Sequence, residues 1–128
     1  MKTIKQTYFI QASISDVWMA LTEAKQITAW GGGPAKMNDK EGSTFSLWGG
    51  DIHGKNIEVI KEKKLKQEWY SGDWNEASIV TFSLHQKDTT TQVDLIHTNI
   101  PDGEAKDIED GWKEYYMNPL TTLCEGNS

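Results

Sequence analysis

The sequence predicts an α+β fold in which an antiparallel sheet packs against one long C-terminal helix. Between residues 44 and 97, short segments that alternate apolar and polar residues follow one another closely, as in an antiparallel meander. Two short helical patterns precede this meander, and a long amphipathic segment, Asp107–Glu125, follows it. A helix with one apolar face must bury that face, and the sheet is the surface that the chain offers.

The N-terminal third predicts one strand and two short helices. Residues 4–10 alternate as a first strand, and Ser13, with Asp16 three residues later, forms an approximate capping box for a first helix. A second helix is expected over about 23–30. It should end at residues 31–34, because the glycine run releases the helix and Pro34 cannot continue it.

About six antiparallel strands are expected after the helices, which gives about six or seven in total, and five of them can be placed. They fall at about residues 44–48, 52–60, 65–70, 79–84 and 92–97, with turns at 49–51, 71–73 and 86–89. A loop with Pro101 and Gly103 leads into the final helix. That helix should carry a stripe at helical spacing, made of Ile108, Trp112, Tyr115, Tyr116, Leu120 and Leu123. Pro119 lies within it and should kink or break it.

Length and composition indicate a single domain over residues 1–128 that folds in the cytoplasm. A net charge of −6 argues against a nucleic-acid partner. No apolar run reaches the roughly 20 residues of a membrane span, and the N-terminus turns polar too early for a signal peptide. The single cysteine, Cys124, cannot form an internal disulfide, which favours a reducing compartment.

Charge is unevenly distributed along the chain. Residues 99–128 carry seven acids and two lysines, whereas residues 55–66 carry five lysines and two glutamates. The lysine-rich segment is either a solvated turn whose lysines discourage edge pairing or a docking patch for an acidic partner.

Few residues suggest catalysis. The three histidines lack metal-ligand spacing, no nucleophile motif is present, and neither a metal nor a cofactor is expected. His97 shares a strand face with core positions, so it is either a satisfied interior histidine or a ligand-contacting imidazole. Asn56 and Glu58 share a strand face. The sequence alone leaves open whether this face points toward the core or toward solvent. An interior Glu58 would be a candidate general acid or base.

Aromatic residues are the other notable group, with six tryptophans, four tyrosines and three phenylalanines. Such side chains usually fill a core, but they also line apolar pockets. Trp112 and Tyr116, one turn apart on the final helix, are expected to face Phe82 and Leu95 on the sheet.

Four motifs in order resemble one known family. They are Phe45–Gly54 (FSLWGGDIHG), Leu65–Trp69 (LKQEW), His97–Pro101 (HTNIP) and Gly111–Tyr116 (GWKEYY). Together they resemble the START-like helix-grip superfamily (SRPBCC), in the branch related to the C-terminal domain of the activator of heat-shock protein 90 ATPase. The resemblance implies a curved antiparallel sheet of about six or seven strands wrapped around the long C-terminal helix, with an apolar cavity between them. It also implies functions that range from binding lipids and other hydrophobic molecules to cyclase-type catalysis and co-chaperone action. Full-length eukaryotic activators carry a further N-terminal domain, for which this chain has no room.

The sequence therefore predicts non-catalytic binding of a small hydrophobic or amphipathic molecule between the sheet and the final helix. The residues expected to line that site are Trp30, Phe45, Leu47, Trp69, Phe82, Leu95, His97, Trp112 and Tyr116. One alternative is a chaperone-associated interaction module that docks through surface charge. Another is a cyclase- or hydrolase-type enzyme, which requires Glu58 and His97 to converge on one cavity.

Overall fold

A computed structural model describes residues 1–72 and 74–126 and contains the predicted elements in the predicted order. The elements are β1 (Lys2–Ile10), α1 (Ile14–Thr22), α2 (Ala24–Trp30), β2 (Thr44–Leu47), the 3₁₀ turn η1 (Trp48–Gly50), β3 (Ile52–Ile60), β4 (Lys64–Ser71), β5 (Ser78–Lys87), β6 (Thr90–Ile100), the 3₁₀ turn η2 (Asp102–Glu104), α3 (Ala105–Gly111), the π-helical segment η3 (Trp112–Met117) and α4 (Asn118–Gly126). The helix-grip α+β prediction is confirmed.

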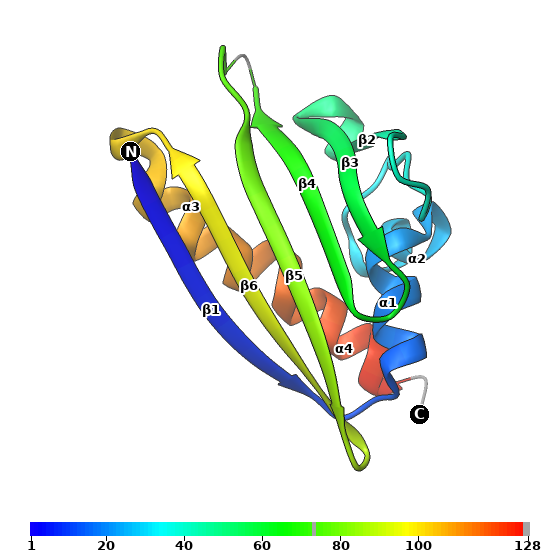
Figure 1. Ribbon diagram of the computed structural model, residues 1–128. Helices are drawn as coiled ribbons and strands as arrows, with labels where there is room; N and C mark the ends of the chain where they lie inside the picture. Colours follow the sequence, from blue (N-terminus) through cyan, green and yellow to red (C-terminus); the bar gives the residue numbers. More distant parts are fainter. Residues whose placement is uncertain (73, 127–128) are drawn as a thin grey trace.

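The six strands of the described residues form one antiparallel sheet in the order β1-β6-β5-β4-β3-β2. The sheet is curved, and the C-terminal helical segments cross one of its faces (Figure 1). Helices α1 and α2 contact α4 on that same side. The helices therefore cover one face of the sheet, and the curved sheet wraps around the C-terminal helix.

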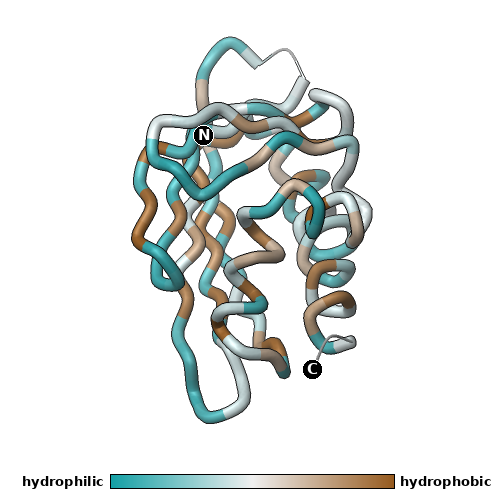
Figure 2. Tube along the Cα trace, turned by 90° about the vertical axis from the view of Figure 1, so that its right-hand side faces the viewer, coloured by the Kyte–Doolittle hydropathy of each residue, from teal (hydrophilic) through white to brown (hydrophobic). Residues whose placement is uncertain are grey.

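The strand register assembles the core from the alternating residues. Phe82 pairs with Leu65 on one side and Leu95 on the other, and all three are fully buried under the helix. Figure 2 shows hydrophobic and hydrophilic residues alternating along the strands. Burying one face of each strand is what a half-covered antiparallel sheet requires.

The local signals of the first helices act as predicted. The hydroxyl of Ser13 accepts a hydrogen bond from the backbone N–H of Asp16 at 3.1 Å, which caps α1. Helix α2 ends at Gly31, whose φ of 107° lies in the left-handed region. No helix among residues 1–72 and 74–126 is long and apolar enough to cross a membrane.

The C-terminal helix departs from the predicted stripe. The backbone N–H of Asn118 bonds to the carbonyl of Lys113, five residues earlier, so η3 is wider than an α-helical turn. Pro119 has no N–H to donate to the carbonyl of Tyr115, which weakens the α-helical ladder at this point. The extra residue rotates the buried face, so that Met117 is fully buried and Tyr115 is 65% exposed. Placing Tyr115 on the buried stripe was wrong for this reason.

Several strand boundaries also differ from the prediction. Strand β5 continues to Lys87 and β6 begins at Thr90, so the turn between them is confined to Asp88 and Thr89. Strand β6 also continues to Ile100. Trp48 leaves the strand and begins η1 with a φ of 50°. The turn expected at 71–73 includes residue 73, which lies outside the described residues.

Candidate functional site

A chain of hydrogen bonds joins the C-terminal helix to the sheet through buried polar groups. The indole N–H of Trp112 donates to Nδ1 of His97 at 2.9 Å. Because an indole can only donate, Nδ1 is the acceptor, and the imidazole proton resides on Nε2. That N–H donates to the hydroxyl of Ser78 at 2.7 Å, and the hydroxyl donates to the carbonyl of Trp69 at 2.6 Å. The chain links η3 to strands β6, β5 and β4.

Burial keeps the His97 imidazole neutral. Desolvation lowers the pKa of His97 from 6.5 to about 3. Both ring nitrogens have partners, and Trp69 packs edge-on against the ring at 4.7 Å. Of the two alternatives for His97, this geometry supports an interior histidine whose ring nitrogens both have hydrogen-bond partners.

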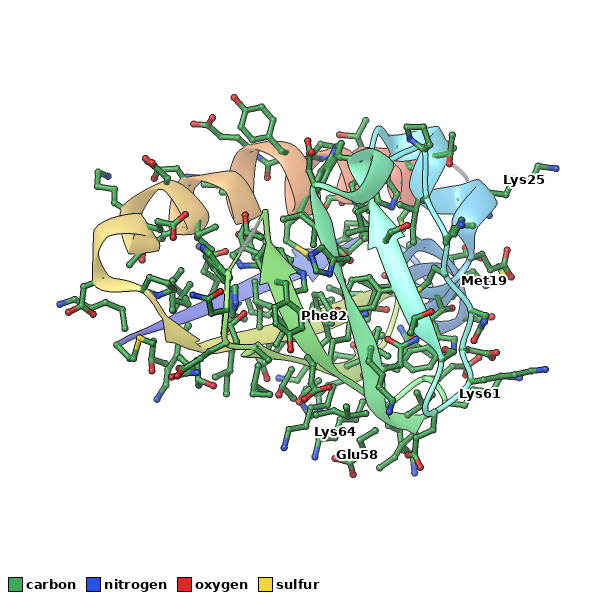
Figure 3. All side chains as sticks on the ribbon, turned by 90° about the horizontal axis from the view of Figure 1, so that it is seen from above. Met19, Lys25, Glu58, Lys61, Lys64 and Phe82 are labelled. Atoms are coloured by element: carbon green, nitrogen blue, oxygen red, sulfur yellow. The ribbon has the colours of Figure 1, made fainter. Side chains whose placement is uncertain are left out.

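Glu58 does not join His97. A bulge in β3 between Asn56 and Glu58 shifts the register, so that Asn56 is fully buried while Glu58 pairs opposite Lys66. The Glu58 carboxylate forms an ion pair with Lys64 at 3.0 Å. In Figure 3, Glu58 and Lys64 lie on the side of the sheet away from the helices. The two residues required for the cyclase or hydrolase hypothesis therefore lie on opposite faces.

Asn56 instead anchors the segment before β2. Its side-chain oxygen accepts a hydrogen bond from the Gln67 amide at 2.9 Å. Its amide donates to the carbonyl of Asn38 at 3.0 Å and to the hydroxyl of Ser43 at 3.3 Å. This buried polar cluster fixes a loop to the sheet, which is a structural role.

An apolar hollow of about 230 Å³ lies between the C-terminal helix and the corner that joins β2 to β3. We call it the helix–corner hollow. Its lining residues are Trp48, Asp51 and Ile52 from the corner, Trp69 from β4, and Asp107, Ile108, Gly111, Trp112, Tyr115 and Tyr116 from α3 and η3. The most buried of these residues are Trp69, Trp112 and Tyr116, which form its floor.

The structure divides the nine residues expected to line a cavity into two groups. Trp69, Trp112 and Tyr116 line the helix–corner hollow. The other six, Trp30, Phe45, Leu47, Phe82, Leu95 and His97, are buried in the core beside it. Phe82 illustrates why: its ring packs against Trp112 at 5.7 Å and Tyr116 at 5.9 Å, which closes the space between the sheet and the helix at that point. In Figure 3, Phe82 lies between the sheet and the helix.

Sequence reasoning missed the corner side of the hollow. Trp48 and Asp51 belong to a turn, and the pattern gives no reason for that turn to approach the helix. The available signal was the tryptophan itself, since a turn rarely exposes so large an apolar side chain. Trp48 packs against Tyr116 at 6.4 Å, and its indole N–H donates to the carbonyl of Gly31.

The floor of the hollow holds one unpaired donor. Trp69 is 4% exposed, and its indole N–H has no hydrogen-bond partner among the described residues. A buried donor without a partner costs about 1–3 kcal/mol. No cluster of three metal-ligating side chains occurs within residues 1–72 and 74–126.

A second hollow of about 450 Å³ lies between α1, α2 and the turn that follows β3. Its lining includes Met19, Lys25 and Lys61, which Figure 3 places along one edge of the molecule. Glu23 and Asp39 also line it, so charges of both signs share this surface. Such a lining favours no single ligand charge, and the helix–corner hollow is the better candidate site.

Comparison with known proteins agrees with this architecture. The family model described as "Activator of Hsp90 ATPase homolog 1-like protein" matches residues 11–125. An activator of 90 kDa heat shock protein ATPase homolog from Dictyostelium discoideum is 31% identical over 93% of this chain and 32% of its own length. The chain thus spans about a third of the length of the curated relatives it matches.

Two solved structures extend the comparison to the fold. PFC0360w, an HSP90 activator from Plasmodium falciparum, superposes with a TM-score of 0.89 at 27% identity, and the match covers 96% of each chain. The Aha1 dimer from Colwellia psychrerythraea gives a TM-score of 0.82 at 21% identity over the full length of both chains. The second likeness concerns the fold alone.

Proposed function

The chain belongs to the activator of Hsp90 ATPase homolog 1-like family, and from that premise we propose that it binds a chaperone of the Hsp90 class in the cytoplasm and raises its ATPase activity. The observation that carries this proposal is the match to PFC0360w, which extends over 96% of both chains.

The charged turn between β3 and β4 is the surface that we assign to chaperone docking. Lys61 and Lys63 are exposed there, next to the Glu58–Lys64 ion pair. Surface charge of one sign speeds encounter with a partner of opposite sign and is screened by salt. Glu62 lies between the two lysines, so the turn keeps a net charge of +1, and it is this small excess of lysine that we match to an acidic face on the chaperone.

Binding to a purified Hsp90-class chaperone of the same organism, measured by calorimetry, tests this assignment. Binding should weaken as salt rises, because the contact is electrostatic. The double change Lys61→Glu and Lys63→Glu should weaken it by roughly ten-fold at low salt. The matched control, Lys5→Glu with Lys87→Glu, changes the charge equally at exposed sites elsewhere and should leave affinity nearly unchanged. Equal losses in both variants, or no binding at low salt, contradict the proposal.

A second function, binding of a small hydrophobic or amphipathic molecule, is favoured by the helix–corner hollow. Aromatic rings floor this hollow, and Asp51 and Asp107 supply polar groups in its lining. Ligand sites in proteins combine such apolar walls with a few polar groups. A cavity of about 150 Å³ accommodates benzene, so a hollow of about 230 Å³ suits a ring with a short side chain.

The probe 2-phenylethanol tests this second function. Its titration should shift the indole N–H signals of Trp69 and Trp112 in nitrogen-15 NMR spectra to saturation. Gly111 lines the hollow, and a Cβ added there meets no atom within 4 Å, so Gly111→Leu should fill the space and abolish the shifts. The control Gly103→Leu, also at an open glycine but outside the lining, should keep them. Shifts that persist in the Gly111→Leu variant rule out binding in this hollow.

A further inference from the structure

The rim of the helix–corner hollow carries one carboxylate on each wall. Asp51 belongs to the corner before β3, and Asp107 lies on α3 across the opening. We propose that the hollow is selective for an organic cation, namely a ligand with an aromatic or apolar body and an ammonium head. This inference rests on the ligand-binding function proposed above and adds the charge of the ligand.

Both carboxylates are free to accept a cation. Neither the Asp51 nor the Asp107 side chain has a hydrogen bond or ion pair within residues 1–72 and 74–126. Among the other acids of this segment, Glu104 accepts the Trp74 indole N–H at 2.5 Å and Asp110 pairs with Lys106. Glu109 and Glu114 are exposed and do not line the hollow, so Asp107 is the acid of this helical segment that faces it.

The aromatic lining offers a second kind of cation contact. Five of the ten residues that line the hollow are tryptophan or tyrosine, and none of those ten is lysine, arginine or histidine. Tyr115 is exposed and Trp48 half-buried, so their rings remain accessible beside the carboxylates. The face of an aromatic ring attracts an ammonium group, by about 0.5–1 kcal/mol at exposed sites.

The wider charge distribution acts in the same direction. Residues 102–114 carry six acids and two lysines, and the whole chain has a net charge of −6. A negative field around an apolar cleft concentrates cations and repels anions. An anionic ligand such as a fatty acid would meet two unpaired carboxylates at the entrance.

Three soluble probes of matched shape, 2-phenylethylammonium, 2-phenylethanol and phenylacetate, test the inference through the indole N–H shifts at pH 7. The ammonium probe should bind roughly ten-fold more tightly than the alcohol, from two carboxylates and one or two ring faces. Phenylacetate should bind more weakly than the alcohol. If the alcohol binds in the hollow but the ammonium binds no more tightly, the inference fails while the ligand-binding function stands. If none of the three binds, both fail.

Variants then locate the selectivity. Changing Asp51→Asn together with Asp107→Asn should reduce the ratio of the alcohol and ammonium dissociation constants from roughly ten to roughly two to five, because the carboxylates are lost while the ring faces remain. Asp39→Asn with Asp88→Asn removes the same charge outside the hollow and should preserve the ratio. Tyr115→Leu, at an exposed position, should lower the ratio by roughly two- to five-fold without unfolding the protein. A ratio that both double variants lower equally overturns the inference, because the selectivity would then come from net charge alone.

Discussion

Replacing Trp112 by alanine is expected to lower the free energy of unfolding by about 3–5 kcal/mol, the usual cost of truncating a buried aromatic residue. Trp112 is 3% exposed and stacks on Trp69 at 5.4 Å, with Tyr116 at 4.7 Å. Its loss would also leave the Nδ1 acceptor of His97 without a donor. Urea unfolding followed by circular dichroism measures the change.

Two further variants separate the contributions of Trp112. Trp112→Phe keeps an aromatic ring but removes the N–H, so it should cost about 1–3 kcal/mol. Tyr115→Ala changes an exposed neighbour on the same segment and should cost less than about 0.5 kcal/mol. Equal costs for Trp112→Ala and Tyr115→Ala would mean that Trp112 does not hold the helix against the sheet.

Acid is expected to destabilise the fold through His97. The pKa of His97 is about 3 in the fold, against 6.5 for an ordinary histidine. Between these values the unfolded chain binds a proton that the folded chain does not, so stability falls as pH decreases. The contribution is fully present above about pH 6.5 and is lost at up to about 1.4 kcal/mol per pH unit below it. Protonation would also place a proton on Nδ1, which could then no longer accept the hydrogen bond from the Trp112 N–H.

The variant His97→Gln isolates this effect, because glutamine does not titrate while the carboxylates titrate in both proteins. Between pH 7 and pH 5, the unchanged protein should lose about 2 kcal/mol more of its unfolding free energy than the variant loses. Identical pH dependence in the two proteins would show that His97 is not held neutral by burial.

The sequence predicts most of the fold because each element carries a local signal. Ser13, Gly31 and the alternation around Phe82 act in the structure as their residue types suggest. The differences from the predicted structure arise where a strand or helix contains one extra residue, which changes the face on which the following side chains lie. The bulge after Asn56 and the wide turn before Asn118 each shift a pattern by one residue, and neither has a signal in the alternation of apolar residues.

The candidate site was harder to predict than the core. Trp112 and Tyr116 could be placed on the sheet-facing side of the helix from spacing alone. The approach of Trp48 and Asp51 depends on how far β2 and β3 curve toward α3, which is a tertiary property. The hollow therefore lies at the edge of the contact between the sheet and the C-terminal helix. Phe82 and Leu95 lie beside it, where side chains fill the space between the two.

The two proposed functions make separate use of the surface. The lysine turn after β3 is the proposed docking surface for the chaperone, and the helix–corner hollow is the proposed ligand site. Because the fold alone is compatible with many activities, each function depends on its own site and its own test.

The most direct test of the proposed function is the steady-state ATP hydrolysis rate of an Hsp90-class chaperone from the same organism, measured at low salt with increasing amounts of this protein. A saturable rise in rate is expected, reduced by Lys61→Glu with Lys63→Glu and retained by Lys5→Glu with Lys87→Glu. A rate that stays constant up to a large excess of folded protein would contradict the assignment of activator function.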